Sequence, residues 1–191
     1  MHNFAKLTGV SRNVLKTVAK FRIYLKSNKI VWTRSRIILS VLLSTLLIFG
    51  LEKMILGEIK DNQTNEIIGY VMLISFALGI VNNFFREELK GKLTGHIIFF
   101  DEKIQISEKV YLLSEIKLIQ IEGYDYFDRL ILYNFPSGMF SSGVNNTLTI
   151  FLYDGNIITT NFQKNYEDEM RKINKQLTIY KNEGKLKLQS Y

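Results

Sequence analysis

Two uncharged apolar runs, separated by a short polar stretch, limit the structures that this chain can adopt. Ile37–Leu51 has 15 residues and Ile67–Phe85 has 19. A helix that crosses a hydrocarbon core needs about 20 residues, at about 1.5 Å each. The second run meets this length alone, and the first meets it when extended to Gly57 with Lys53 reaching the interface. We therefore predict a two-helix transmembrane hairpin over residues 37–57 and 66–85, joined by EIKDNQTNE.

A pair of buried helices in a soluble protein is the alternative interpretation, because such helices have a similar composition. Small residues in the second run, among them Gly69 and Gly79, would let another helix approach closely. The transmembrane helices are therefore also a candidate surface for homo-oligomer formation.

The positive charge of the chain is confined to its N-terminal part. Residues 1–36 hold nine Lys or Arg and no acid, residues 37–85 carry −2, and residues 86–191 are neutral, with 14 charges of each sign. Short loops rich in Lys and Arg stay on the cytoplasmic side of a membrane. The distribution predicts a multi-pass protein of the inner (plasma) membrane with both termini cytoplasmic. It also disfavours nucleic acid as a partner of the C-terminal half.

Residues 1–36 are predicted as a basic cytoplasmic amphipathic helix, because Leu7, Val10, Val14 and Val18 recur at helical spacing. Its basic side chains would lie at an anionic membrane surface. The candidate membrane-surface residues are Arg12, Lys16, Lys20, Arg22, Lys26, Lys29, Arg34 and Arg36. Three interpretations remain open: the charges only fix topology, they dock on lipid, or they bind nucleic acid or a protein.

Residues 86–191 are predicted as one cytoplasmic β-rich domain, because apolar residues alternate there with a period of two. The dipeptide Asp154-Gly155 lies between two such runs and is a strong hairpin signal. A final amphipathic helix is expected to begin after an N-cap at Asn165 and to end at Gly184. Six or seven antiparallel strands and one helix indicate a small β-barrel or sandwich with a C-terminal capping helix, so the fold class is an α+β membrane protein.

The layout of two spans, then LTGHIIFFDEKIQI, VYLLSEIKLIQI, LTIFLYDGN and a closing helix resembles bacterial membrane proteins with a pleckstrin-homology-like (PH-like) domain. The resemblance implies a seven-stranded cytoplasmic barrel capped by a helix. It does not imply lipid-headgroup binding by the barrel, because Asp101-Glu102-Lys103 stands where lipid-binding members carry a basic cluster.

No pattern in the sequence predicts catalysis, a metal or a cofactor. The chain has no cysteine and two histidines, and it has no nucleotide-binding glycine fingerprint. One stretch rich in Gly, Ser and Asn is a candidate recognition loop, with an ordinary strand connection as the alternative. Its candidate residues are Ser141, Ser142, Gly143, Asn145 and Asn146.

These features predict a non-catalytic membrane protein that presents a PH-like interaction or regulatory module to a protein partner. Two alternatives remain: a sensor of anionic lipid surfaces that uses the basic N-terminal helix, and a membrane-tethered DNA-binding regulator.

Overall fold

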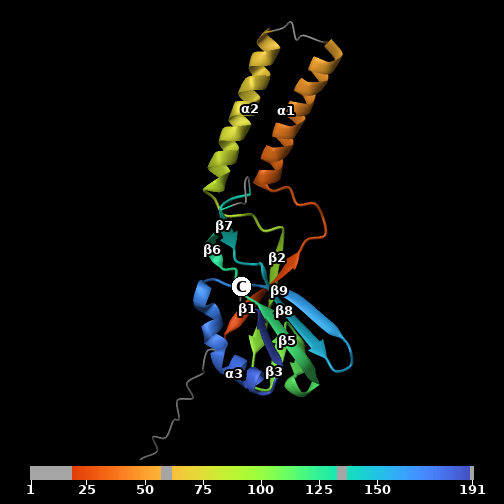
Figure 1. Ribbon diagram of the computed structural model, residues 1–191, viewed down its shortest axis with the longest axis vertical. Coiled ribbons are helices and arrows are strands. Elements are labelled where there is room, and N and C mark those ends of the chain that lie inside the picture. Colours follow the sequence, from red (N-terminus) through yellow and green to blue (C-terminus); the bar gives the residue numbers. More distant parts are fainter. Residues whose placement is uncertain (1–18, 57–61, 133–136, 190–191) are drawn as a thin grey trace, which may run out of the picture.

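The computed structural model describes residues 19–56, 62–132 and 137–189. These residues form a long molecule with a pair of helices at one end and a β domain at the other (Figure 1). The prediction of a mixed α+β fold with two long apolar helices is confirmed.

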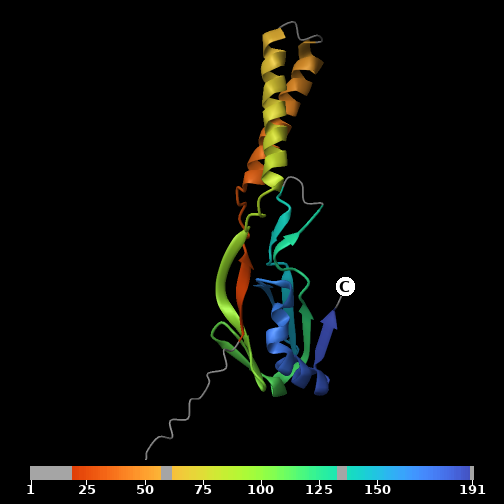
Figure 2. The same ribbon diagram turned by 90° about the vertical axis from the view of Figure 1, so that its left-hand side faces the viewer.

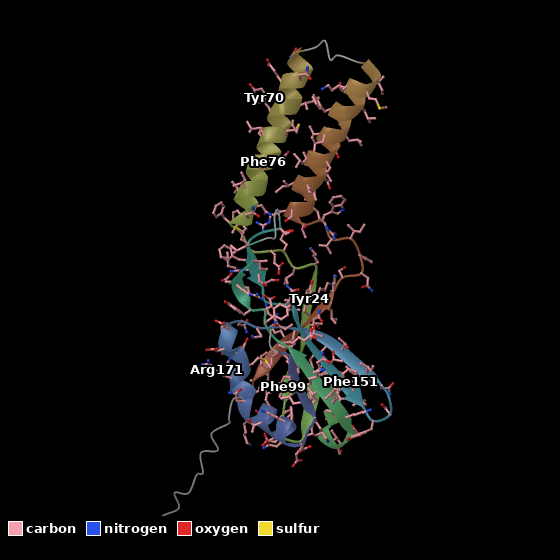
Figure 3. All side chains as sticks on the ribbon, viewed as in Figure 1. Tyr24, Tyr70, Phe76, Phe99, Phe151 and Arg171 are labelled. Atoms are coloured by element: carbon pink, nitrogen blue, oxygen red, sulfur yellow. The ribbon has the colours of Figure 1, made fainter. Side chains whose placement is uncertain are left out.

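The helices are α1 (Arg34–Leu56) and α2 (Asn62–Asn83), which pack side by side as a hairpin. On α2 the residues that face α1 recur every three or four positions, with Ser75, Gly79 and Asn82 buried. Among the α1 residues whose burial the structure describes, Thr45 is the buried one. Most other apolar side chains of the pair are exposed, including Tyr70 and Phe76, which project outward from α2 (Figure 3). The two helices are therefore not buried within this chain.

The β domain contains one large sheet, nearly all of it antiparallel. Its strand order is β10-β5-β8-β9-β1-β2-β3-β4. The strands in chain order are β1 (Lys20–Lys26), β2 (Gly91–Phe99), β3 (Lys103–Ile106), β4 (Lys109–Leu112), β5 (Ile116–Glu122), β8 (Asn146–Leu152), β9 (Ile157–Gln163) and β10 (Leu186–Gln189). The Asp154-Gly155 dipeptide joins β8 to β9 as predicted, with Gly155 at a φ of +90°.

The strongly curved sheet encloses a core of aliphatic and aromatic side chains (Figure 2). Phe21 lies at the centre of this core and makes edge-to-face contacts with Phe99 and Phe162, at ring-centroid distances of 5.8 and 5.5 Å. Such contacts add to the free energy that burying the rings already provides. The core therefore joins β1, β2 and β9.

The closing segment begins as a 3₁₀ helix over Glu167–Ile173 and continues as α3 (Asn174–Asn182). Three of its apolar residues are buried against the sheet: Ile173, Leu177 and Tyr180. The Tyr180 hydroxyl donates a hydrogen bond to the Phe100 carbonyl oxygen over 2.5 Å. The predicted N-cap is wrong, since Tyr166 occupies that position without a side-chain cap. The predicted end is confirmed, because α3 stops just before Gly184, whose φ is +70°.

The prediction of a helix over residues 1–36 is wrong for Lys20–Lys26, which form strand β1. This strand is central in the sheet, where it pairs with β2 on one side and β9 on the other. The first predicted segment therefore contributes to the β domain, and the α1–α2 hairpin is an insertion between two paired strands. Residues 1–18 lie outside the described residues.

Three further strands, β10, β6 and β7, add to the expected strand count. β10 follows α3 and pairs in parallel with β5. β6 (Phe127–Leu130) and β7 (Phe140–Ser142) form a separate two-stranded sheet near the α1–α2 hairpin.

Candidate functional site at the helix–domain junction

We call the region where the α1–α2 hairpin meets the β domain the junction. The connections from β1 to α1 and from α2 to β2 both pass through it, and the β6–β7 sheet lies beside it (Figure 1). Backbone hydrogen bonds fix the β6–β7 sheet to the end of α2. The Met139 N–H donates to the Asn83 carbonyl oxygen over 2.8 Å, and the Glu87 N–H donates to the Phe140 carbonyl oxygen over 2.8 Å.

Gly138 allows this close approach. Its φ is +90°, and a Cβ atom there would lie 2.5 Å from the Phe85 carbonyl oxygen. A side chain would therefore displace the β6–β7 sheet from the segment that follows α2.

Two arginines at the junction are oriented by carboxylates and aromatic rings. Arg34 Nε donates to Glu88 Oε1 over 2.6 Å, and its guanidinium lies 5.1 Å from the Phe85 ring centroid. Arg86 binds both carboxylate oxygens of Asp128, at 2.6 and 3.0 Å, and lies 3.9 Å from the Phe127 ring centroid. Such exposed pairs contribute little to stability, so their main effect is to orient the two guanidinium groups.

Behind the arginines lies a buried polar network centred on Asp125, whose exposure is 2%. Asp125 Oδ2 accepts hydrogen bonds from Ser141 Oγ over 2.8 Å and from the Asn145 N–H over 3.0 Å. Asn146 Oδ1 accepts from the Asp125 N–H over 2.9 Å. A buried carboxylate is tolerated only when such donors surround it. The network therefore holds the loop that follows β7 in one conformation.

Glu87 extends this network to the segment that follows α2. Its Oε1 accepts hydrogen bonds from the Ser142 N–H over 3.2 Å and from Ser142 Oγ over 3.0 Å. The exit of α2 is therefore tied to β7 through both backbone and side-chain bonds.

Lys164 lies at the opposite side of the network and is 3% exposed. Its Nζ donates to the Gly123 carbonyl oxygen over 2.6 Å. Burial lowers the pKa of Lys164, while the carboxylates of Glu169 and Asp125 act in the opposite direction. The lysine thus supplies a positive charge next to buried acids and holds the ends of β5 and β9 together.

The residues of the predicted recognition loop are brought together, but mostly as interior groups. Ser141, Ser142, Gly143 and Asn146 are buried. Asn145 alone among the five is exposed. The side chains of the other four are therefore not available to a partner, and that part of the prediction is corrected to a structural role.

The predicted membrane-surface residues do not form one surface. Lys20 and Arg22 lie on β1, whose Lys20 end is about 20 Å from its Lys26 end. Lys26, Lys29, Arg34 and Arg36 follow one another toward and into α1, at the junction. Arg12 and Lys16 lie outside the described residues.

Sequence reasoning missed Glu87, Asp125 and Lys164 as partners in one network. Each bond joins segments far apart in the chain, and no local spacing signals it. Beside the network lies a polar cavity of about 190 Å³. It is lined by Tyr24, Lys26, Glu87, Glu88, Leu89, Lys90, Ser142, Val144, Asn145 and Asn161.

β4 is an edge strand of the large sheet, at the opposite end of the strand order from β10. Val110 and Leu112 on this strand are 46% and 47% exposed. An edge strand offers backbone groups for pairing, and exposed apolar side chains beside it add area for contact.

No protein-family model, no curated protein and no solved structure matches this chain. Arguments about function therefore rest on its own residues.

Proposed function

We propose that this chain is a non-catalytic integral membrane protein whose hairpin α1–α2 holds a PH-like interaction module at the cytoplasmic membrane surface. The observation that carries the proposal is the insertion of the hairpin between β1 and β2, two strands that pair with each other. Both helices are long and apolar enough to cross a membrane. The β domain is thereby tied to the helices by both ends of the insertion.

The strand order supports the PH-like assignment. Seven of the strands run β4-β3-β2-β1-β9-β8-β5, which is two antiparallel meanders joined where β1 pairs with β9. The C-terminal helix packs on the shared core. This arrangement fits the seven-stranded, helix-capped barrel that the sequence resemblance implies. The hairpin interrupts it after its first strand, whereas the sequence alone suggested that the domain begins after the second span.

Charge at the junction supports a cytoplasmic β domain. Lys26, Lys29, Arg34 and Arg36 precede and begin α1, and Arg86 and Lys90 follow α2. Bases that flank spans in this way stay on the cytoplasmic side.

Cysteine labelling in intact cells tests the topology, because the chain has no cysteine of its own. Gln63→Cys lies near the start of α2, and Asp154→Cys lies in the exposed turn between β8 and β9. We expect a membrane-impermeant maleimide to label the first variant in intact cells and the second only after lysis. Labelling of Asp154→Cys in intact cells would contradict the proposed orientation.

The interaction role is assigned to the edge of β4, by addition of a strand from a protein partner. A photo-crosslinking amino acid at Val110 of the full chain tests this in native membranes. The matched control is position Tyr153, which is 65% exposed but lies near the β8–β9 turn. We expect an adduct of discrete mass from position 110 and none from position 153. Equal crosslinking from both positions would refute a specific edge.

A further inference from the structure

Two cavities meet at the junction and differ in chemical character. The first has a volume of about 570 Å³ and is lined by Arg34, Phe84, Phe85, Arg86, Asp128 and Phe140. The second has a volume of about 270 Å³ and lies between α1 and α2, lined by Arg34, Ile37, Ile38, Leu78, Val81, Asn82 and Phe85. Arg34 and Phe85 line both cavities, so the two are neighbours.

We propose that these cavities together form a binding site for one glycerophospholipid, with its phosphate between Arg34 and Arg86 and an acyl chain between α1 and α2. The site rests on the membrane insertion proposed above. It is separate from the edge of β4 and adds a ligand to the protein.

The geometry of the arginines suits a phosphate. Arg34 Nη2 donates to the Arg86 carbonyl oxygen over 3.2 Å, so the two residues lie next to each other. The Nε and Nη2 groups of both side chains are engaged, and no described residue accepts a hydrogen bond from either Nη1. The side chains are 44% and 45% exposed. Guanidinium groups bind phosphate through charge-assisted hydrogen bonds, and an oriented pair provides donors from two directions.

The second cavity suits an acyl chain. Its lining is aliphatic and aromatic apart from Arg34 and Asn82, and Asn82 uses its Nδ2 to bond Ser35 Oγ across the hairpin over 3.1 Å. From Leu78 to Asn82 this groove follows α2 for about 6 Å. A groove of this kind between helices, opening toward basic residues at the cytoplasmic side, is the general form of a lipid site in a membrane protein.

Carboxylates give the site a mixed character. Asp128 and Glu88 hold the two guanidinium groups, so the site carries both signs of charge. Asp128 has a φ of +65°, an uncommon conformation for a residue other than glycine, and it aims its carboxylate at Arg86. The shared chemistry of the ligand is therefore the phosphodiester, whether the remaining headgroup is neutral or carries an ammonium.

Native mass spectrometry of the full chain in a mild detergent tests the proposal. Phosphatidylglycerol and phosphatidylethanolamine are added separately, with diacylglycerol as the lipid that lacks a phosphate. We expect one tightly retained molecule of at least one phospholipid per chain and no comparable retention of diacylglycerol. Preference between the two phospholipids identifies the headgroup. Equal retention of diacylglycerol would overturn the proposal.

Substitutions distinguish a specific phospholipid site from non-specific lipid around the helices. Arg86→Gln is expected to weaken retention by about tenfold or more, since it removes a charge-assisted contact. Arg129→Gln is the matched control: Arg129 lies in β6 next to Asp128, but it contacts Tyr124 and is outside both cavities. Equal effects of the two substitutions would overturn the proposal.

A second pair of variants leaves the arginines intact. Leu78→Trp fills the groove, whereas Leu73→Trp adds the same side chain at a position that is 64% exposed and outside the groove. We expect only Leu78→Trp to displace the lipid. Identical retention by both would refute an acyl chain between the helices. Alkaline extraction of membranes tests insertion separately: a chain that stays in the membrane without retaining phospholipid refutes the site alone.

Discussion

The α1–α2 hairpin and the β domain use apolar residues in opposite ways. In the β domain Ile97, Ile104, Ile116, Ile119 and Ile150 are fully buried. In the hairpin Ile48, Ile55, Ile67 and Ile74 are each more than half exposed. The β domain therefore has the burial pattern of a protein folded in water, whereas the exposed apolar side chains of the hairpin are what the proposed membrane insertion requires. The two regions adjoin at the junction, where hydrogen bonds and ion pairs make most of the contacts.

The same truncation in both regions tests this contrast most strongly. Ile150→Ala removes a side chain with no exposure, and we expect it to lower the free energy of unfolding of the β domain by about 2–5 kcal/mol. Ile48→Ala removes one that is 55% exposed, and its effect should be within about 0.5 kcal/mol. Hydrogen exchange of the full chain in micelles measures both. Equal effects would show that the hairpin is packed against something else.

Substitution by arginine should have the opposite pattern, with the larger effect in the hairpin and the smaller effect in the β domain. Ile48→Arg places a charge where lipid is expected, at a cost of about 3 kcal/mol of insertion free energy, so alkaline extraction should release more of the chain. Ile157→Arg changes a residue that is 62% exposed at the start of β9 and should leave extraction unchanged. Equal extraction of the two variants would contradict a membrane around the hairpin.

The packing of the junction is tested by comparing Gly138, which lies there, with Gly155 in the β8–β9 turn, since both have a φ of +90°. Gly138→Ala places a methyl group against the Phe85 carbonyl oxygen, whereas a Cβ atom at Gly155 meets nothing within 4 Å. We expect Gly138→Ala to cost about 1–3 kcal/mol more than Gly155→Ala. The Glu87 and Met139 amides should then exchange hydrogen faster, because their backbone hydrogen bonds at the junction are weakened. Equal exchange would mean that the β6–β7 sheet is not held closely.

Tyr180 tests how the helix closes the β domain. Burial and the nearby Asp101 raise the pKa of its hydroxyl above the ordinary value of 10.0. The unfolded chain therefore releases this proton first, and the stability that Tyr180 contributes is present below pH 10.0 and lost as the pH rises above it.

Tyr180→Phe should lower stability by about 1 kcal/mol at neutral pH and reduce the loss above pH 10.0. Thermal unfolding of the full chain in micelles, followed by tyrosine circular dichroism, measures both effects. Lys164 is present in both proteins, so its opposite pH dependence cancels in the difference. An unchanged pH profile would contradict burial of the hydroxyl.

Length and local patterning were sufficient to predict the two long apolar helices, the β8–β9 hairpin and the end of α3, although α2 begins at Asn62, within the stretch predicted as a loop. β1 was missed because its buried residues do not alternate cleanly. Phe21 and Ile23 face the core, but the register shifts between Arg22 and Ile23, so Tyr24 is buried as well. The same residues also fit a helical spacing, and proximity to a basic segment favoured that interpretation.

The junction was beyond the reach of sequence patterns for a different reason. Ser141 and Ser142 look like an accessible loop until Asp125 and Glu87 are placed beside them. Their partners lie 16 and 55 residues away along the chain. The polar sequence around Ser141 and Ser142 therefore predicted an exposed loop, whereas the structure buries these residues.

The position of the hairpin between β1 and β2 sets the order in which the protein can be made. β1 leaves the ribosome before both helices, whereas its neighbours β2 and β9 are synthesised after them. If the hairpin lies in the membrane as proposed, β1 pairs with β2 only after both helices are made, and it gains its second neighbour when Ile23 meets Phe162 of β9. Closing such a distant pair is intrinsically slow. The domain therefore completes its sheet around a strand that is already anchored.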